Sequence, residues 1–340
     1  MKVLVAMSGG VDSSIAAAML RDAGHDVTGC TMRLWGGASD TGCCSVADVD
    51  DARRVAQQLD IPHYVFEFAH DFNAGVVEHY IASHAAGLTP NPCIECNRHV
   101  KFDRLLRRAG QLGFDAVATG HHARIRRDGD GVRLLRGADV AKDQSYVLYV
   151  LGRHQLERCL FPVGEITKAE VRSRAAELGL RTAAKPDSVE VCFVTASGGR
   201  EDLLRSRVGL RPGRVVDASG AVVGRVDATE LVTVGQRRGL GIGGGDRRYA
   251  LSIDPAGGTV VVGGLDDLMT DTVHLTGTTW VDGPATGPVL AQTSAHGAAV
   301  EADYDGDGSL RFAAPHRRVA PGQSVVLYRG DEVLGGGMAG

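Results

Sequence analysis

The spacing of apolar residues predicts alternating strands and helices over the first part of the chain. Each predicted strand is a short apolar run, whereas the helices repeat their apolar residues every three or four positions. Such alternation is typical of an α/β, doubly wound parallel sheet, in which ligands bind at the carboxyl ends of the strands. The predicted strands are residues 2–7, 25–34, 64–68 and 115–119, and the predicted helices are 13–22, 48–59 and 98–113.

The pattern changes near residue 195. Beyond it, short Val/Leu/Thr runs such as 213–217 and 258–263 are separated by Gly, Pro and Asp. Short runs of this kind are typical of small β-rich domains. Together with a break near 265–272, they predict two small β-rich domains after the parallel sheet. We therefore expect three domains, at residues 1–195, 196–267 and 268–340.

Composition narrows the class of protein. The chain has 340 residues, of which 44% are hydrophobic and 23% charged, values that exclude a disordered chain. It contains no apolar run of the ~18 residues that a membrane span needs. Residues 1–7 lack the apolar length and cleavage site of a secretory signal. We expect a cytoplasmic protein with no membrane partner.

Charge is distributed unevenly. The formal net charge is −4, but residues 101–250 carry 27 basic and 18 acidic side chains, a balance of +9. The segments before and after them are both acidic. A basic middle can bind phosphate groups, although a solvated face with no partner explains it equally well. Six arginines in this region could contact phosphates: Arg104, Arg107, Arg108, Arg124, Arg126 and Arg127.

The seven cysteines do not suggest a disulfide framework, because their number is odd and no export signal precedes them. Cys96 lies just before a predicted helix, whose dipole favours the thiolate. Cys192 follows a polar turn, and its surroundings fit a reactive thiol and a buried strand residue equally well. Two others, Cys30 and Cys159, lie in apolar surroundings typical of packing residues, and we assign Cys43 and Cys44 no role.

A glycine- and serine-rich loop joins the first strand to the first helix. Two adjacent glycines allow a sharp turn, and backbone amides at a helix start can bind phosphate. The loop is neither a Walker loop nor a dinucleotide-binding Gly-x-Gly-x-x-Gly turn. The alternative is a plain strand–helix turn with a serine cap. The loop reads Ser8-Gly9-Gly10-Val11-Asp12-Ser13-Ser14.

This loop resembles that of the ATP pyrophosphatases, which cleave ATP between the α and β phosphates. Further stretches make the whole chain similar to the tRNA-specific 2-thiouridylases, with an adenine nucleotide alpha hydrolase-like sheet. These stretches are Met32-Arg33-Leu34-Trp35, Thr89-Pro90-Asn91-Pro92, Cys96-Asn97, Lys101-Phe102, Ala118-Thr119-Gly120-His121, Lys142-Asp143-Gln144-Ser145-Tyr146, Asp187-Ser188, Cys192-Phe193, Gly235-Gln236-Arg237-Arg238-Gly239-Leu240-Gly241 and Pro321-Gly322-Gln323.

The resemblance implies a function and a set of site residues. It implies adenylation of O2 of the wobble uridine (U34) of tRNA, followed by transfer of sulfur from a persulfide on Cys192, with Cys96 as partner thiol. Magnesium would accompany ATP, a cysteine desulfurase or persulfide carrier would supply sulfur, and the tRNAs would be those for Lys, Glu and Gln. The implied ATP-binding residues are Ala6, Met7, Ser8, Gly9, Gly10, Val11, Asp12, Ser13, Met32 and Gly120, and the implied tRNA contacts are His121, Lys142, Asp143, Gln144 and Gln323.

The chain departs from the family pattern at Cys93, where relatives commonly have Asp. Cys93 and Cys96 thereby form Cys-x-x-Cys, and Cys192 is a candidate third thiol. Three thiolates can hold a [4Fe–4S] cluster with one open iron, which gives a hypothesis for sulfide binding. The Arg-Tyr pair expected near residues 292–294 is also missing, so contacts of the last domain with tRNA are less secure.

Three other functions remain open. One is an amide-forming synthetase of the pyrophosphatase type, which needs ammonia and no reactive cysteine. Another is an RNA-binding protein that no longer uses its nucleotide site. The third is a metal- or cluster-binding redox module.

Overall fold

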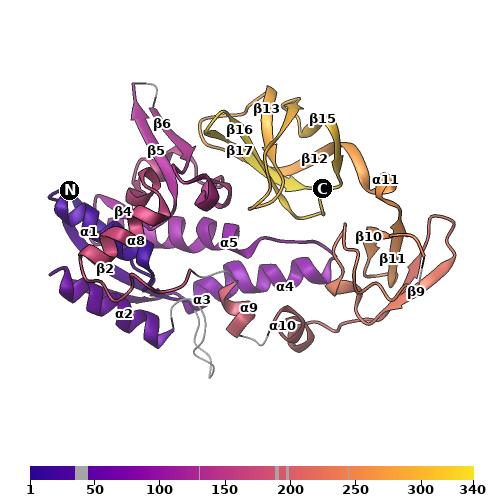
Figure 1. Ribbon diagram of the computed structural model, residues 1–340, viewed down its shortest axis with the longest axis horizontal. Coiled ribbons are helices and arrows are strands. Elements are labelled where there is room, and N and C mark those ends of the chain that lie inside the picture. Colours follow the sequence, from indigo (N-terminus) through magenta and orange to yellow (C-terminus); the bar gives the residue numbers. More distant parts are fainter. Residues whose placement is uncertain (35–44, 130, 188–190, 197–198, 244) are drawn as a thin grey trace.

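The computed structural model describes residues 1–34, 45–129, 131–187, 191–196, 199–243 and 245–340. Its amino-terminal part is built on a five-stranded parallel sheet in the order β3-β2-β1-β4-β7 (Figure 1). The chain moves outward from β1 to β3 and then returns to the other side of β1. This reversal confirms the predicted doubly wound sheet, and ligands bind where it occurs. The strands are β1 (Lys2–Ala6), β2 (Asp26–Arg33), β3 (His63–Glu67), β4 (Ala116–Ala118) and β7 (Cys159–Leu160).

Both faces of this sheet are covered, as the unbroken apolar runs predict. Val3 and Val5 of β1 belong to one buried cluster, and Leu4 and Ala6 belong to another, because successive side chains point to opposite faces. Helices of the first cluster are α1 (Val11–Asp22), α2 (Val46–Gln58) and α8 (Lys168–Glu177). Helices of the second are α3 (Ala69–Phe72), η1 (Asn73–Val77), α4 (Glu78–Ala85), α5 (Pro92–Glu95), η2 (Cys96–Arg104) and α6 (Leu105–Gln111).

The helix predicted at 98–113 begins earlier than expected. Asn91 caps it by accepting a hydrogen bond from the Cys93 amide at 3.1 Å, and Pro92 occupies its first turn. Both residue types favour a helix start. The run then continues as the π-helix η2 and as α6. Cys96 therefore lies one turn inside the helix rather than just before it.

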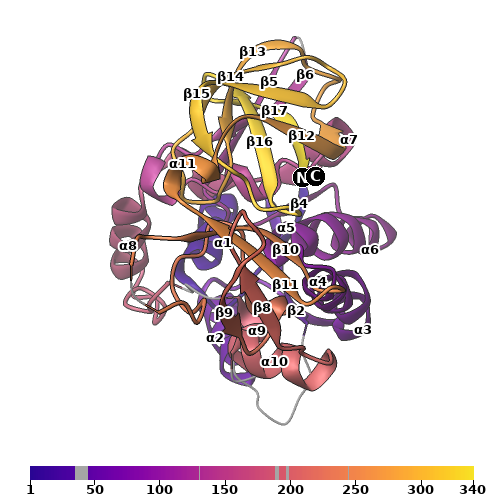
Figure 2. The same cartoon turned by 90° about the vertical axis from the view of Figure 1, so that its right-hand side faces the viewer.

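Two β-rich units follow, as predicted (Figures 1 and 2). The first is a four-stranded sheet of β8 (Gly213–Val216), β9 (Val222–Val226), β10 (Tyr249–Asp254) and β11 (Thr259–Gly263), with η6 (Thr229–Leu231). The second is a barrel that closes through pairing of β12 with β17. The helix α11 (Leu265–Leu268) packs on β10 and β11 and leads into the barrel. The barrel strands are β12 (Met269–Trp280), β13 (Gly287–Gln292), β14 (Val300–Tyr304), β15 (Ser309–Arg317), β16 (Ser324–Arg329) and β17 (Glu332–Ala339).

A hairpin from the amino-terminal part joins the barrel sheet. Its strands are β5 (Ala123–Asp128) and β6 (Gly131–Arg136), and β6 pairs with β17 at Leu135 and Glu332. Nearby, the buried Tyr146 hydroxyl donates to the Ser324 carbonyl at 2.7 Å. The sequence did not predict this association, because a strand's partner is not encoded in its own pattern.

The remaining short elements connect these units: η3 (Val140–Lys142), η4 (Ser145–Leu148), α7 (Arg153–Leu156), η5 (Pro162–Glu165), α9 (Cys192–Ala196) and α10 (Arg200–Arg207). Across the residues that the structure describes, the helices are all too short or too polar to span a bilayer.

Candidate active site

The predicted ATP-binding segments meet at the carboxyl ends of three neighbouring strands. The loop from Ser8 to Gly10 leaves β1 and leads into α1, Met32 lies near the end of β2, and Gly120 follows β4. Strands β2 and β4 flank β1 on its two sides. The fold thus places the loop and both outlying residues at the reversal point of the sheet, where the sequence predicted a nucleotide site.

The loop is held by its own serines. The Ser14 hydroxyl donates to the Gly10 carbonyl at 2.8 Å, and the Ser13 hydroxyl donates to the same carbonyl at 3.1 Å. The Ser8 amide donates to the Ser13 hydroxyl at 3.2 Å. Gly10 is the amino-terminal cap of α1 and has no side chain, so the first amides of the helix face the loop without a side-chain acceptor. This arrangement suits an anion.

Two glycines permit backbone contacts that no other residue allows. Gly9 has a φ of +72°, and a Cβ placed on it would lie 2.4 Å from the Asp48 carbonyl oxygen in the first turn of α2. A Cβ on Gly120 would lie 2.6 Å from the Ser13 amide nitrogen and 2.7 Å from the Asp12 carbonyl carbon. The turn after β4 therefore packs directly on the start of α1.

Replacing Gly120 with alanine should weaken ATP binding, because the added methyl group meets backbone that cannot rotate away. Overpacking of this kind costs about 1–3 kcal/mol, and a loss of ~1.4 kcal/mol in binding lowers affinity about tenfold. Titration calorimetry with ATP measures the effect. Gly209→Ala is the matched control, since a Cβ there has open space around it. Equal affinity of the Gly120 variant and wild type would contradict the site.

Asp12 is the acidic residue of the loop, and two cationic or protonatable groups hold it. Lys168 Nζ lies 2.6 Å and 2.8 Å from its two carboxylate oxygens, and His122 Nε2 lies 3.0 Å from one of them. Burial alone would raise the pKa of Asp12, but the hydrogen bonds from His122 and Lys168 outweigh burial and lower it. The Lys168 side chain is only 11% exposed. The positive charge of Lys168 is therefore held beside Asp12 and is largely shielded from solvent.

The same lysine connects the loop with the segment that leads to Cys192. Lys168 Nζ also lies 2.8 Å from Asp187, which binds Lys142 and Arg172 at 2.8 Å each. A second lysine, Lys185, donates to the Gly9 carbonyl at 3.0 Å and pairs with Asp48 and Asp51 of α2. Residues 185–187 are thus fastened to the loop at two points.

The Asp187 network should make stability depend on pH. Burial raises the pKa of Asp187, but hydrogen bonds from Lys142 and Lys168 lower it to about 2. The unfolded carboxyl has a pKa of about 3.9. Between these values the unfolded chain binds more protons than the folded chain does. The stabilisation that ionised Asp187 contributes is therefore complete above about pH 4 and disappears as the pH falls toward 2.

Urea titrations of wild type and Asp187→Asn between pH 2 and pH 7 measure this contribution as the difference in unfolding free energy. The difference should be constant near neutral pH and should shrink as the pH falls through the window. Exposed Asp202→Asn on α10 is the control. A difference that does not change with pH would show that the Asp187 charge is not what matters.

Cys192 begins the short helix α9 and is half-buried, so the alternative of a buried strand residue is wrong. Its neighbour Phe193 anchors the helix. The Phe193 ring is 1% exposed and meets the rings of Phe72 and Tyr80 edge-on at 5.7 Å and 5.3 Å. The helix is therefore fixed on the sheet face that carries α3 and α4.

Cys96 and Cys192 border one hydrophobic cluster. Cys96 is a buried member of that cluster, and Cys192 packs against it partly exposed. Cys192 is the fifth residue after Asp187 along the chain, so their Cα atoms lie within about 18 Å of each other even if the chain is fully extended. Asp187 and Asp12 share the Lys168 ammonium, so the segment that leads to Cys192 starts beside the loop.

The ligand set proposed for a [4Fe–4S] cluster does not fit. Cys93 is exposed whereas Cys96 is buried. Within the described ranges, no three His, Cys, Asp or Glu side chains are grouped so that they could hold a metal ion. Cys43 and Cys44 lie outside the described residues.

The residues predicted to contact tRNA have different surroundings. Lys142 and Gln144 are exposed, and the Gln144 side chain accepts from the His122 amide at 2.9 Å. Asp143 accepts hydrogen bonds from Arg136, the Gly137 amide and Ser145, so its carboxylate holds its own loop. Asp143 therefore stabilises its own loop, a role that the sequence did not predict.

His121 and Gln323 are less accessible than the other predicted tRNA contacts. His121 is buried between the rings of Phe102 and Phe161, and burial lowers its pKa well below the usual range. Gln323 is partly exposed in the loop before β16. That loop touches the segment leading to Cys93, since the Thr89 amide donates to the Pro321 carbonyl at 2.7 Å.

Sequence reasoning missed Lys168, His122 and Lys185. Lys168 is the first residue of α8, after the cap Thr167. A cation is unfavourable at a helix amino terminus, and that mismatch was the available signal for Lys168. His122 follows the quoted Gly120-His121 motif, but nothing in its own spacing singles it out.

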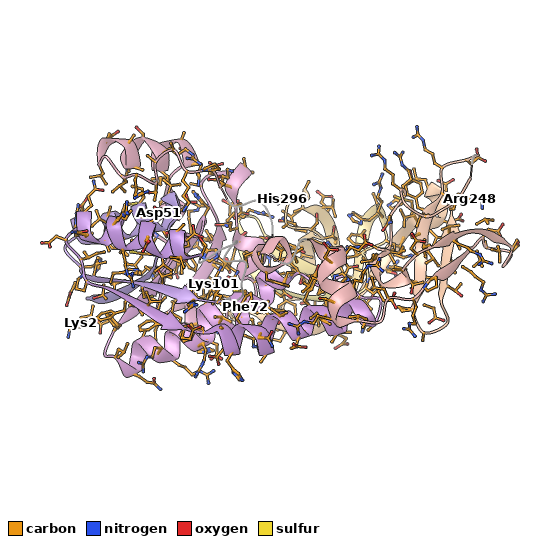
Figure 3. The ribbon with its side chains drawn as sticks, turned by 90° about the horizontal axis from the view of Figure 1, so that it is seen from below. Lys2, Asp51, Phe72, Lys101, Arg248 and His296 are labelled. Carbon is orange, nitrogen blue, oxygen red and sulfur yellow. The ribbon has the colours of Figure 1, made fainter. Side chains whose placement is uncertain are left out.

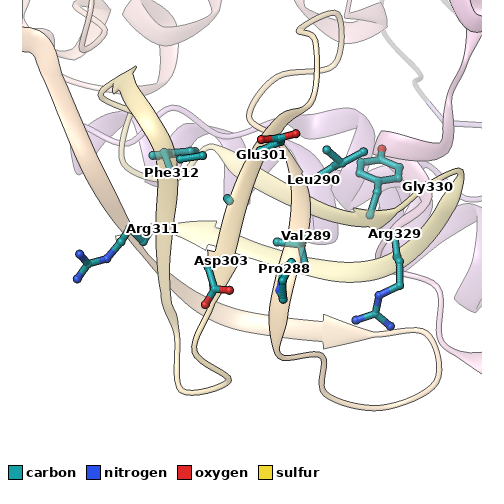
Figure 4. A pocket seen from close by; sticks show the side chains of 12 residues that line it. Pro288, Val289, Leu290, Glu301, Asp303, Arg311, Phe312, Arg329 and Gly330 are labelled. Carbon is teal, nitrogen blue, oxygen red and sulfur yellow. The ribbon is translucent and has the colours of Figure 1, made fainter.

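An open pocket lies on the barrel, away from this site (Figure 4). Strands β13 to β16 line it, and Asp303 lies directly opposite Arg311 in the strand register. It contains none of the residues that the sequence analysis selected, and we assign it no function.

Family profiles match all three parts of the chain. The profile described as "tRNA methyl transferase HUP domain" matches residues 1–196, "tRNA methyl transferase PRC-barrel domain" matches 201–264, and "Aminomethyltransferase beta-barrel domain" matches 287–339. Among solved structures, a 4-thiouridine synthetase in complex with RNA and ATP covers 54% of this chain at 19% identity, with a TM-score of 0.38.

Curated relatives match over nearly the full length. The tRNA-specific 2-thiouridylase MnmA of Roseiflexus sp. (strain RS-1) is 47% identical, and the match covers 99% of this chain and 98% of the relative. The proteins of the same name from Chloroflexus aggregans and Acidothermus cellulolyticus are each 48% identical, over 98% of this chain and 97% and 96% of theirs. With its parallel sheet, glycine-rich loop and two β-rich units, the chain belongs to the tRNA-specific 2-thiouridylase family.

Proposed function

We propose that the protein uses ATP to convert the wobble uridine (U34) of tRNA into 2-thiouridine. Family membership supports tRNA thiolation. The observation that carries the chemical proposal is the chain of ion pairs from Asp12 through Lys168 to Asp187, which ties the segment leading to Cys192 to the nucleotide loop. Activation and sulfur delivery can therefore take place at neighbouring positions.

In the first step, O2 of the uracil attacks the α phosphorus of ATP, and the bond to the β phosphate breaks. Pyrophosphate leaves, and the adenylated oxygen becomes a leaving group on C2. Loop amides at the start of α1 would bind the phosphates. Lys168 lies beside the loop and would neutralise the negative charge that builds up on the departing pyrophosphate.

In the second step, the terminal sulfur of a Cys192 persulfide attacks C2, and AMP leaves. Cys96 then attacks Cys192 Sγ and closes a disulfide while the thiocarbonyl is released. In the alternative route, Cys96 attacks the persulfide before any bond to C2 forms, and the sulfide that it frees attacks C2 and displaces AMP. Both routes leave a Cys96–Cys192 disulfide, which a dithiol reductant must reduce before the next cycle.

Magnesium fits this site. Asp12 provides a carboxylate on the loop itself, and Mg²⁺ usually combines one or two carboxylates with waters and substrate phosphate oxygens. Bound there, the ion would neutralise phosphate charge. A [4Fe–4S] cluster does not fit, so we route no step through one. Cys93 stands where relatives carry Asp, and we propose it only as a neighbour of the reacting base.

The partners that we propose are tRNA and a sulfur donor, either a cysteine desulfurase or a persulfide carrier. The acceptors are the tRNAs for Lys, Glu and Gln. Lys142, Gln144, His121 and Gln323 are proposed tRNA contacts, with Asp143 holding the loop that presents the first two. The residue division 1–195, 196–267 and 268–340 remains our proposal for the domains.

Incubation of tRNA with ATP, Mg²⁺ and labelled persulfide tests the proposal. We expect labelled 2-thiouridine at position 34, in amounts that depend on ATP. An amide-forming synthetase would instead require ammonia and would leave no sulfur in RNA. A protein that only binds RNA would release no pyrophosphate, and either result would contradict the proposed reaction.

A further inference from the structure

All six arginines that the sequence suggested as phosphate contacts already interact with other groups of the protein. Arg104 pairs with Asp71 and Arg124 with Asp331. The others are also engaged: Arg107 pairs with Asp103, Arg126 pairs with Asp128 and Glu332, Arg127 donates to the carbonyls of Leu156 and Cys159, and Arg108 lies over the Phe66 ring. A nucleic acid would have to compete with these partners, whereas arginines without such partners are available to it at once.

A second set of arginines lies on the four-stranded sheet of β8 to β11, and five of the six are exposed. They come from β8, β9, the turn at 235–241 and the segment before β10. We call this set the arginine patch: Arg214, Arg225, Arg237, Arg238, Arg247 and Arg248.

Backbone pairing brings these segments together. Arg214 and Arg225 are directly opposite each other on antiparallel β8 and β9, and both point away from the buried Val215 and Val226. The turn at 235–241 lies against β9, because a Cβ on Gly241 would reach within 1.9 Å of the Arg225 carbonyl oxygen.

Further contacts place the rest of the arginine patch beside that turn. The Ala250 amide donates to the Gln236 carbonyl at 2.9 Å, so the segment at 247–249 runs alongside the turn that carries Arg237 and Arg238. The Gln236 side chain donates to the Arg238 carbonyl at 2.8 Å and fixes the turn. The six arginines therefore come from segments that lie side by side.

The arginine patch is not neutralised from within. Like charges directly opposite on a sheet are destabilising, yet throughout the described part of the chain none of the six arginines forms a salt bridge. The charge of Arg248 contributes to lowering the pKa of Asp217, but the Asp217 carboxylate already accepts hydrogen bonds from Ser219 and Ala221. One guanidinium nitrogen of Arg248 is buried with no hydrogen-bond partner. An external anion bound by the exposed members of the patch would relieve the repulsion between them.

The arginine patch lies far from the nucleotide loop. In Figure 1 the elements α1, α2 and β2 lie at one end of the molecule, and β9 lies at the other. Figure 3 likewise shows Arg248 at the end opposite to Asp51 of α2. A ligand that contacts both places must be long and carry many negative charges, as a folded RNA does.

We propose that the arginine patch binds the phosphate backbone of the tRNA substrate at a distance from the base that is modified. This inference rests on the proposed function, because it takes tRNA as the polyanion. The contact is with phosphates rather than bases, so it adds affinity without selecting a sequence. Binding of phosphate would account for neighbouring arginines that form no salt bridge within the described part of the chain.

The test compares Arg214→Gln/Arg225→Gln with the control Arg53→Gln/Arg54→Gln, which removes two exposed arginines from α2 at the other end of the molecule. Filter binding measures Kd for full-length tRNA and for an isolated anticodon stem–loop over a series of salt concentrations. The patch variant should bind full-length tRNA about tenfold more weakly, and its salt slope should fall by roughly 2. Its affinity for the stem–loop should match that of wild type.

Several outcomes would overturn the inference: unchanged affinity and salt slope for full-length tRNA, an equal loss for the stem–loop, or the same loss in the control. Thiolation at saturating tRNA is measured in parallel, and the patch variant should keep the wild-type kcat. If wild type binds tRNA through the arginine patch but forms no 2-thiouridine, the proposed function fails while the patch inference stands.

Discussion

Replacing Cys192 with serine should abolish 2-thiouridine formation and leave ATP binding intact. Serine has nearly the same shape, so α9 and the packing of Phe193 on Phe72 and Tyr80 should persist. A hydroxyl cannot carry a persulfide, and no other described thiol combines partial exposure with a tether to the nucleotide loop. Nucleoside analysis of tRNA measures the product, and calorimetry measures ATP affinity.

The size of this effect separates two roles for Cys192. If it carries the sulfur, the rate should fall below detection, because the alternative is direct attack by sulfide from solution. Adding sulfide at high concentration should then restore part of the activity to Cys192→Ser, since the adenylated base is still made. Thiolation by the variant at the wild-type rate would remove Cys192 from the mechanism.

Replacing Lys168 with methionine should slow pyrophosphate release by about 10²–10³-fold, the usual effect of removing one group that stabilises charge in a transition state. The lysine Nζ lies within 2.8 Å of both Asp12 and Asp187. Nucleotide bound at the loop, as we propose, would place phosphate beside these carboxylates, and the buried ammonium would neutralise the charge of both. Pyrophosphate release in a single turnover measures the effect.

Arg174→Met is the matched control for Lys168→Met, because Arg174 is an exposed cation in the last turn of the same helix. This control should release pyrophosphate at the wild-type rate. Lys168→Arg should recover part of the lost rate, since it keeps the charge with a different shape. If Lys168→Met releases pyrophosphate normally but unfolds more easily, the lysine serves stability alone.

Local sequence patterns predicted the parts of the fold that depend on local rules. The apolar run at 2–7 followed by glycines and serines predicts β1, the loop and α1, because each of these elements forms from neighbouring residues. The change to short Val/Leu/Thr runs after residue 195 likewise predicted the two β-rich units. Closure of the barrel through β12 and β17 was beyond such patterns, since it depends on how distant strands pair.

The site was less predictable than the fold because its charges come from distant segments. Lys168 is far along the chain from Asp12, and no spacing rule connects them. Cys192 could be read equally well as a strand residue, since Val191 and Phe193 flank it with apolar side chains. In the structure Cys192 begins the short helix α9, and Phe193 packs against Phe72 and Tyr80, which are distant in the sequence.

Single-turnover transfer from protein loaded with labelled persulfide tests the central claim most directly, namely that the nucleotide loop and Cys192 act on one uridine together. The loaded protein is mixed with tRNA, ATP and Mg²⁺, with no other source of sulfur. We expect one labelled 2-thiouridine at position 34 for each pyrophosphate released, and none without ATP. Release of pyrophosphate without labelled sulfur in the nucleoside would contradict the account.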